Sequence, residues 1–359
     1  MKTLALGLMS GTSMDGIDVA IVDMQDQRLV MGQTFAYPKE LSEKLKVVMK
    51  GHPFDMCFFA ELNREVGQAF AKAAKTLVQE LNEPIQVIGS HGQTLCHQVH
   101  QELPFTWQIG CPYTIYEELK VPVVFDFRSH NVVQGGQGAP LAPLYHQYLW
   151  SKSRPVAVVN IGGISNISLL RENLPLVGYD IGPGNCLSDA WIATHFDATY
   201  DKEGRWAAKG QISQVLLDKL LSDAFFQKPY PKSIGKEYFS LSWLTKYMEG
   251  MVLLHEDVQA TLIYLTARLI ADEIKRQMPI DARVCICGGG VKNQVFMNHL
   301  RMLLNPMVVQ STDEIGISSD FLEAMMMAWL GWCRLQNVRH DVSSVLGGHD
   351  QQFLGLICQ

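Results

Sequence analysis

The sequence predicts an α/β protein built from two domains. With 359 residues, the chain is long enough for two domains that each bury a hydrophobic core. Short apolar runs that are typical of buried strands alternate with helical patterns along it. A glycine-rich hairpin near the N-terminus is followed by a second one near residue 160, where a similar pattern of strand, glycine turn and returning strand begins again. We therefore expect one domain over residues 1–150 and another over residues 151–359.

The composition excludes several classes of protein. Hydrophobic residues make up 47% of the chain, charged residues 18%, and the net charge is -6. A chain this apolar is not disordered, and its negative charge does not favour nucleic acid as a partner. We find neither a signal-peptide pattern nor an apolar run of membrane-spanning length, so we expect a cytoplasmic protein with no membrane partner.

The eight cysteines are scattered along the chain, and we expect most of them to be reduced core residues. Cys285 and Cys287 form the only close pair. In an apolar strand they point to the same face, with no third or fourth ligand beside them. The sequence therefore predicts no metal cluster.

The first hairpin lies at residues 4–22. Two apolar strand patterns, residues 4–9 and 17–22, flank a turn in which Gly11 and Gly16 free the backbone. Backbone N–H groups in such a turn can converge on an anion, and hydroxyl groups at positions 10, 12 and 13 add donors. The turn predicts either a phosphate-binding hairpin or an ordinary hairpin with a polar tip.

Two polar loops follow strands in the first domain. A long helical pattern at residues 58–81 leads into an apolar strand at 85–89, which ends in the loop 90–94. A second strand, at 121–127, ends in the polar segment 126–130. Functional loops of α/β folds gather at strand ends, so both loops are expected at one cleft.

The second domain opens with a strand at residues 156–160 and a glycine turn at 161–168. A short strand at 176–179 then leads to Asp180, a Gly-Pro-Gly turn and a helix from 186 to 195. Asp257 is expected to cap a later helix whose apolar residues recur at the spacing of a packed face.

A strand at residues 284–287, three glycines and a helix from 293 to 303 come next. Glycines without side chains let an adenine ring or a phosphate approach the backbone closely. The other interpretation is a tight connection between strand and helix.

The motifs along the chain resemble those of the anhydro-N-acetylmuramic acid kinase family, in the actin-like ATPase superfamily. The matching segments are residues 7–18, 89–94, 126–128, 135–140, 160–166, 180–185, 287–290 and 311–313. The resemblance implies two actin-like (ribonuclease H-like) α/β domains that flank a nucleotide and sugar cleft. It also allows the last helix to pack back on the first domain.

The resemblance implies an ATP-dependent kinase. The family uses ATP and water to convert 1,6-anhydro-N-acetylmuramic acid into N-acetylmuramic acid 6-phosphate in peptidoglycan recycling. It further implies Mg²⁺, through the ATP chemistry, and a homodimer. Met9 stands where the superfamily commonly places a metal-binding aspartate, so Asp15 is expected at most to contact the metal through water.

The resemblance also assigns the ATP-binding residues. The first hairpin is expected to bind the ATP phosphates. The second hairpin is expected to lie opposite the first, and the later glycines near the adenosine. These residues are Gly11, Thr12, Ser13, Met14, Asp15, Gly16, Ile17 and Asp18; Gly162, Gly163 and Ser165; and Gly288, Gly289 and Gly290.

The catalytic residue must serve an unusual substrate. A 1,6-anhydro bridge has no free 6-hydroxyl, so water must attack the anomeric carbon as O6 moves to the γ-phosphorus of ATP. We predict that Asp180 is the base for that water, in agreement with the family's proposed base. The alternative role for Asp180 is an N-cap of the following helix.

The sugar carries a lactyl carboxylate, for which Arg128 is the expected partner through two parallel hydrogen bonds. His91, Gln93 and Thr94 are expected to contact sugar hydroxyls or the acetamide, although His91 is equally well explained as a structural histidine. Glu323, at the start of a Met-rich helix, is a further candidate, and its alternative is a solvated helix residue.

Three other functions stay open from the sequence. A kinase for a different amino sugar would keep every nucleotide motif and differ around His91, Arg128 and Asp180. A non-catalytic actin-like ATP-binding protein would need no Asp180. A glycoside hydrolase without ATP would need a second carboxylic acid, and the sequence does not identify one.

Overall fold

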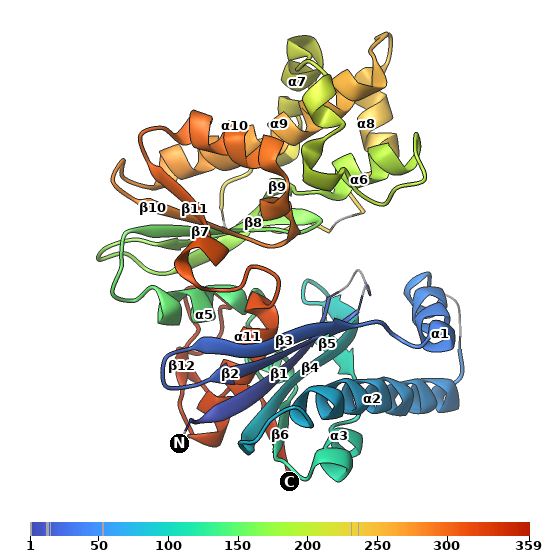
Figure 1. The fold of residues 1–359 in the computed structure, drawn as a ribbon, viewed down its shortest axis with the longest axis vertical. Helices are drawn as coiled ribbons and strands as arrows, with labels where there is room; N and C mark the ends of the chain where they lie inside the picture. The colour runs from blue at the N-terminus through green and yellow to red at the C-terminus, as the bar shows by residue number, and fades with distance from the viewer. Residues whose placement is uncertain (1, 12–13, 15, 52–53, 231, 236) are drawn as a thin grey trace. The chain divides into compact units, whose positions relative to one another are not determined.

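The computed structural model describes residues 2–11, 14, 16–51, 54–230, 232–235 and 237–359. The chain forms two compact units, drawn as ribbons in Figure 1. Unit 1 consists of Met1–Tyr145 together with Phe321–Gln359, and unit 2 is His146–Asp320. Both units are mixed α/β, which confirms the predicted fold class. The boundaries lie at 145/146 and 320/321, whereas the sequence predicts a single boundary at residue 150.

The described strands of unit 1 form a seven-stranded sheet in the order β14-β6-β4-β1-β2-β3, with β5 pairing to β4. Their bounds are β1 Leu4–Ser10, β2 Ile17–Asp23, β3 Arg28–Phe35, β4 Ile85–Gln98, β5 Phe105–Ile109, β6 Val123–Phe125 and β14 Leu356–Cys358. The central strand β1 runs antiparallel to β2 and parallel to β4. All seven residues of β1 are buried, because helices cover both faces of the sheet.

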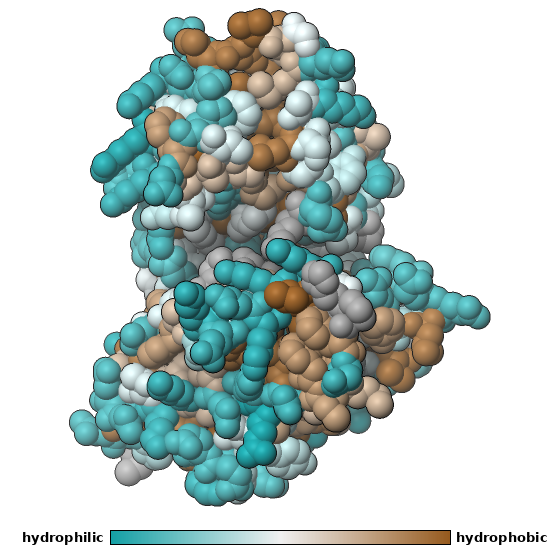
Figure 2. All heavy atoms as spheres, turned by 90° about the vertical axis from the view of Figure 1, so that its right-hand side faces the viewer, coloured by the Kyte–Doolittle hydropathy of each residue, from teal (hydrophilic) through white to brown (hydrophobic). Residues whose placement is uncertain are grey.

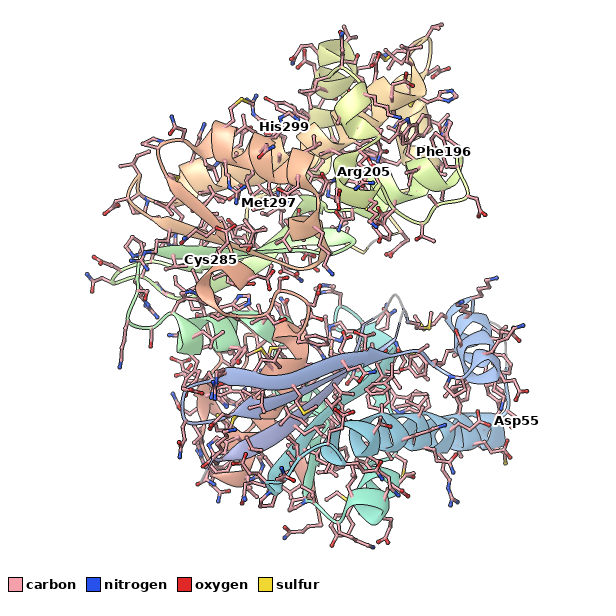
Figure 3. All side chains as sticks on the ribbon, viewed as in Figure 1. Asp55, Phe196, Arg205, Cys285, Met297 and His299 are labelled. Carbon is pink, nitrogen blue, oxygen red and sulfur yellow. The ribbon has the colours of Figure 1, made fainter. Side chains whose placement is uncertain are left out.

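Helices α2 and α11 cover opposite faces of this sheet. Leu6 and Leu8 of β1 share one hydrophobic core with Val66 and Phe70 of α2, whereas Gly7, which points the other way, meets the backbone of α11. Figure 3 labels Asp55 at the start of α2, where its carboxylate accepts a hydrogen bond of 2.8 Å from Phe58 N–H. The helices assigned here are α1 Lys39–Met49, α2 Met56–Val78, α3 Pro112–Leu119, α4 Ser129–Val133, α5 Ala142–Leu149, which contains the unit boundary, and α11 Leu322–Leu335.

Glycines allow α11 to lie directly on the strands. A Cβ atom on Gly7 would stand 1.8 Å from the Ala324 carbonyl oxygen, and one on Gly89 would stand 1.9 Å from the Met327 carbonyl oxygen. From the helix side, a Cβ on Gly331 would come within 3.0 Å of Gly89 Cα. Contact between the backbones, without side chains in between, therefore fixes the C-terminal segment on unit 1. The pairing of β14 with β6 adds to this attachment.

Unit 2 has a five-stranded sheet among its described residues, in the order β11-β10-β7-β8-β9. The strands are β7 Val156–Ile161, β8 Ile164–Leu170, β9 Val177–Pro183, β10 Arg283–Cys287 and β11 Val308–Ser311, and the helices are α6 Cys186–Ala193, α7 Gln214–Leu221, α8 Leu241–Met248, α9 His255–Gln277 and α10 Gln294–Leu304. Figure 3 labels Cys285 on β10 and Met297 on α10. Met297, together with Ile286, which follows Cys285 on β10, belongs to the main core of this unit.

Short elements complete the two units. The 3-10 helices are Lys202–Gly204, Ala207–Lys209, Ala224–Gln227, Gly289–Lys292 and Asp313–Ile315, and a small hairpin pairs β12 His340–Asp341 with β13 Gln351–Gln352. All eight cysteines are free thiols. No helix in the described ranges is both long and apolar enough to cross a membrane. The face drawn in Figure 2 mixes hydrophilic and hydrophobic side chains.

Three local predictions were wrong. Strand β4 does not end at residue 89 but continues to Gln98, because β5 pairs with its second half. Strand β9 likewise runs through Asp180 to Pro183, paired with β8. Asp257 does not cap α9: the N-cap is Leu254, and the Asp257 carboxylate accepts a hydrogen bond of 2.7 Å from Gln211 N–H instead.

We expect Gly89→Ala to destabilise the protein by about 3 kcal/mol or more, because its methyl group would overlap backbone that no side-chain rotation can clear. Gly51→Ala is the control: Gly51 has a φ of +79° but open space around it, so we expect a cost of about 1 kcal/mol from backbone strain alone. Chemical denaturation of both variants measures the difference. Equal losses would show that the contact with α11 is not what requires glycine at position 89.

Candidate functional site

The first candidate element is the tip of the β1–β2 hairpin in unit 1. Its described residues form a tight turn in which Met14 has a φ of +58° and donates its N–H to the Gly11 carbonyl at 3.1 Å. At Gly16 a Cβ would lie 2.8 Å from Thr34 Cγ2, so the adjacent strand β3 leaves no room for a side chain. Three residues assigned to ATP, Thr12, Ser13 and Asp15, lie outside the described residues.

The base of this hairpin is tied to β4. The Ser10 hydroxyl lies 2.9 Å from the Gly16 carbonyl oxygen and 2.8 Å from Gln93 Oε1. Gln93 Nε2 donates to the Gly11 carbonyl at 3.2 Å, and Tyr37 donates its hydroxyl to Gln93 Oε1 at 3.3 Å. Ser10 and Gln93 are buried. Their polar groups therefore serve the hairpin itself.

Two carboxylates lie near the hairpin. Asp18, on β2, accepts a hydrogen bond of 2.6 Å from the Thr34 hydroxyl. The side chain of Glu323, on α11, is exposed, yet surrounding protein removes enough water to raise the pKa of its carboxyl; Asp18 raises that pKa further, and Arg128 lowers it. Ile17 is buried, so only its backbone can meet a ligand. Glu323 thus lies within electrostatic reach of both the Asp18 carboxylate and the Arg128 guanidinium.

Arg128 is held by a buried histidine. Arg128 Nε and Nη2 lie 3.0 Å and 2.9 Å from His91 Nε2, and Nη1 donates to the Gly138 carbonyl at 2.7 Å. His91 Nδ1 lies 3.0 Å from the Gly92 carbonyl oxygen, so Nδ1 carries the proton and Nε2 accepts from the arginine. Among the residues that the structure describes, these three contacts leave two guanidinium N–H groups of Arg128 for a ligand.

Burial and the charge of Arg128 lower the pKa of His91 to about 3, so the ring is neutral at ordinary pH. Burial also lowers the pKa of Arg128 to about 10, with Glu323 opposing that shift, and the guanidinium stays protonated. The neutral imidazole therefore orients a charged arginine. His91, Gln93 and Thr94 all lie on β4, not in the expected loop. Thr94 is half-buried.

The second hairpin, between β7 and β8 in unit 2, exposes backbone. A Cβ on Gly162 would meet only the Ile164 carbonyl oxygen, at 3.7 Å, and one on Gly163 only Cys186 Cβ, at 3.9 Å. No steric constraint therefore requires glycine at these positions. The Gly162 N–H donates to the Ile164 carbonyl at 3.3 Å, and its own carbonyl accepts from Asn185 N–H at 2.8 Å, whereas Gly163 is exposed and offers the more accessible backbone. Ser165 differs, because its buried hydroxyl donates to the Gly182 carbonyl at 3.1 Å.

The three glycines after β10 fall into two kinds. Gly288 has a φ of +81°, and a Cβ there would lie 2.3 Å from Asn160 Oδ1; a Cβ on Gly290 would lie 2.2 Å from Ile161 Cγ2. Both are glycines because β7 packs against them. Gly289 is open, with Asn185 Nδ2 as its nearest neighbour at 3.9 Å. The segment is thus a tight connection that also presents one free backbone position.

Asp180 lies in the middle of β9 and is half-buried. Its Oδ2 accepts hydrogen bonds from Ile234 N–H at 2.9 Å and from the Ser233 hydroxyl at 3.1 Å. Burial raises the pKa of the Asp180 carboxyl, and these two donors partly offset that rise. Asp180 does not cap α6, whose N-cap residue is Asn185. Oδ2 of this carboxylate is thus held in place, whereas neither Ser233 nor Ile234 donates to Oδ1.

Sequence reasoning missed several of these partners. Ser233 and Ile234 lie more than fifty residues after Asp180, in a segment without regular structure. Thr34 and Tyr37 likewise lie in no recognisable sequence motif. Within the described residues, no group of three or more His, Cys, Asp or Glu side chains is arranged to hold a metal ion.

Comparison with known proteins gives one consistent result. The family profile described as "Anhydro-N-acetylmuramic acid kinase" matches residues 3–359. A protein of that name from Legionella pneumophila strain Philadelphia 1 is 44% identical over 359 residues, covering 99% of this chain and 98% of the relative. Another from Haemophilus influenzae is 40% identical over 369 residues, covering 98% and 97%.

Solved structures are more distantly similar. The (R)-2-hydroxyglutaryl-CoA dehydratase component A from Acidaminococcus fermentans aligns with 93% of this chain and 99% of that chain, at 11% identity and a TM-score of 0.48. A ROK family glucokinase from Streptomyces griseus aligns over 92% and 99%, at 12% identity and a TM-score of 0.42. The family assignment rests on the sequence comparisons.

We expect His91 to stay neutral, with its proton on Nδ1, between pH 8 and pH 5. Arg128→Met should raise the pKa of His91 by removing a positive charge, but burial should keep it below the ordinary value of about 6.5. Proton–nitrogen correlation NMR of the imidazole measures both. Arg64→Met, on the exposed side of α2, is the matched control and should leave the ring unchanged. Protonation of His91 near neutral pH would contradict the assignment.

Proposed function

The chain belongs to the anhydro-N-acetylmuramic acid kinase family, and on this premise we propose how its residues carry out the family's reaction. The protein is an ATP-dependent kinase that opens 1,6-anhydro-N-acetylmuramic acid and phosphorylates O6. The products are N-acetylmuramic acid 6-phosphate and ADP, in peptidoglycan recycling.

Asp180 is the general base. It takes a proton from water as the water oxygen bonds to the anomeric carbon; the bond from that carbon to O6 breaks, O6 bonds to the γ-phosphorus, and ADP leaves. The observation that carries this assignment is the carboxylate itself: Oδ2 is held by Ser233 and Ile234, and burial raises its pKa. Fixed orientation and increased basicity are what proton abstraction from water requires.

The departing O6 needs no second carboxylic acid. In an inverting glycosidase, an acid protonates the leaving oxygen while a carboxylate activates water on the other face of the ring. In this reaction the γ-phosphoryl group accepts the leaving oxygen, so a single carboxylate suffices. This supports the kinase over a hydrolase that works without ATP.

Arg128 binds the lactyl carboxylate of the sugar. His91 and Gly138 occupy three of its N–H groups and leave one each on Nη1 and Nη2 to donate to a carboxylate. His91 then acts through Arg128 by orienting it. Thr94 and Glu323 are further sugar contacts in this proposal, because both side chains have surface open to a ligand.

The ATP phosphates bind to exposed hairpin backbone. Exposed Gly163, next to Gly162, has the open backbone that an anion needs, and the first hairpin from Gly11 to Asp18 supplies the other contacts. Gly289 offers the approach to the adenosine, with Gly288 and Gly290 shaping that segment. Ser165 supports the second hairpin from within, through its bond to Gly182.

Mg²⁺ fits this arrangement. The ion commonly takes one or two carboxylates, with phosphate oxygens and water completing its shell. Asp18 would hold it, beside the sugar contact Glu323, whose pKa Asp18 raises. When bound, the ion neutralises charge on the ATP phosphates. We also propose a homodimer, as the family resemblance implies, and a cytoplasmic location, where ATP is available as co-substrate.

We expect Asp180→Asn to lower kcat by about 10²–10⁴-fold, because the amide cannot accept the proton from water. Binding of a nonhydrolysable ATP analogue should stay unchanged. A coupled ADP assay and calorimetry measure the two effects, with mass spectrometry of the phosphorylated sugar as the identity check. Asp218→Asn, an exposed carboxylate on α7, is the control. Near-normal turnover in Asp180→Asn would rule out this base.

The pH profile tests the environment of Asp180. Only the ionised carboxylate accepts a proton, so kcat/KM should fall on the acid side, with an apparent pKa above the ordinary aspartate value. Ser233→Ala removes a donor that favours the ionised form, and we expect the acid limb to move to higher pH by about one unit. Ser222→Ala, another exposed serine, should not move it. A shift to lower pH in Ser233→Ala would contradict the assigned role.

A further inference from the structure

The Gln93 side chain sits at the base of the first hairpin with its polar atoms turned toward that hairpin. It is 0% exposed, and its contacts are Ser10, Gly11, Tyr37 and the Thr94 carbonyl. A buried amide with these partners has no polar atom directed at a sugar. We propose that Gln93 is a positioning residue that holds the first hairpin in the shape that binds ATP phosphates. The proposal rests on the ATP-binding role of that hairpin.

The orientation of the Gln93 amide is determined by its neighbours. Nε2 lies 3.2 Å and 3.4 Å from the carbonyl oxygens of Gly11 and Thr94, which only accept hydrogen bonds. Oε1 lies near two hydroxyl groups, Ser10 at 2.8 Å and Tyr37 at 3.3 Å, which can donate to it. A flipped amide would place its oxygen against two carbonyl oxygens, so the geometry admits one orientation.

These contacts join both ends of the hairpin tip. Ser10 has a single hydroxyl proton, which it shares between the Gly16 carbonyl on the returning side and Gln93 Oε1. On the outgoing side, the Gly11 carbonyl accepts from both Gln93 Nε2 and Met14 N–H, the bond that closes the turn. Gln93 thus contacts the start of the turn directly and its end through Ser10.

The backbone of β4 brings Gln93 to this position. Gly92 has a φ of +73°, and a Cβ there would lie 2.5 Å from the Ile109 carbonyl oxygen. The pairing of β1 with β4 shifts register between Leu8 and Ser10, so that Ser10 pairs with Gln93. On the other side of Gly92, His91 reaches Arg128. One strand therefore orients both the arginine and the ATP hairpin.

The test is Gln93→Met, which keeps the volume and removes every hydrogen bond of the amide. We expect the Kd of a nonhydrolysable ATP analogue with Mg²⁺, measured by calorimetry, to rise about tenfold, since one or two net hydrogen bonds to the hairpin are lost. KM for ATP should rise similarly, and KM for the sugar should change less than about twofold. Gln98→Met, at the exposed end of the same strand, is the matched control.

A double variant separates positioning from general loss of structure. Because Gln93 acts partly through Ser10, the rise in Kd for Ser10→Ala with Gln93→Met should be smaller than the product of the two single rises, whereas independent effects would multiply. Multiplied effects, or a sugar KM that rises as much as the ATP KM, would overturn the proposal. If Gln93→Met does not fold, as judged by circular dichroism, unchanged analogue binding by Ser10→Ala would overturn it, and weakened binding would support it.

Analogue binding also distinguishes failure of this inference from failure of the wider mechanism. If the unmodified protein formed no phosphorylated sugar, the proposed reaction would fail, but ATP-analogue binding by the variants would still decide the role of Gln93. Active enzyme with unchanged analogue binding in Gln93→Met would reject the inference alone.

Discussion

The backbone of α11 lies directly against Gly7 of β1 and Gly89 of β4, and the arrangement of the unit 1 site depends on that contact. Because no side chain separates the helix from the strands, their relative position is fixed by atoms that cannot adopt another rotamer. The same helix carries Glu323 near its start, within electrostatic reach of Asp18 and Arg128. Glu323, from the C-terminal part of the chain, is therefore placed near Asp18 and Arg128, which come from its N-terminal part.

Burial gives the ionisable candidate residues of each unit their distinct roles. Arg128 keeps its charge although burial lowers its pKa, and His91 loses its charge for the same reason, so the pair forms a charged donor held by a neutral acceptor. In unit 2, burial raises the pKa of Asp180 while two donors hold one of its oxygens. The same physical effect keeps a histidine neutral in one unit and makes a carboxylate more basic in the other.

The sequence predicted the α/β class and the glycine turns correctly, because strand patterns and glycine clusters are local signals. It could not separate the roles of individual glycines: Gly288 is required by its contact with Asn160, whereas Gly289 is open, and only tertiary packing makes that difference. Local sequence patterns could not predict the length of β4 either, since pairing with β5 extends this strand. Ser233 bonds Asp180 from a segment with no motif of its own. Which residues finally meet ATP and sugar stays a prediction.

The interrupted course of unit 1 along the chain has a consequence for its synthesis. Its sheet includes β14, and its second face is covered by α11, so residues from both ends of the sequence are needed to finish one core. Unit 2 is continuous in sequence and can fold as soon as residues 146–320 have left the ribosome. The apolar face of β1 and β4 that awaits α11 must stay uncovered during that interval. The strands translated first thus belong to the unit completed last.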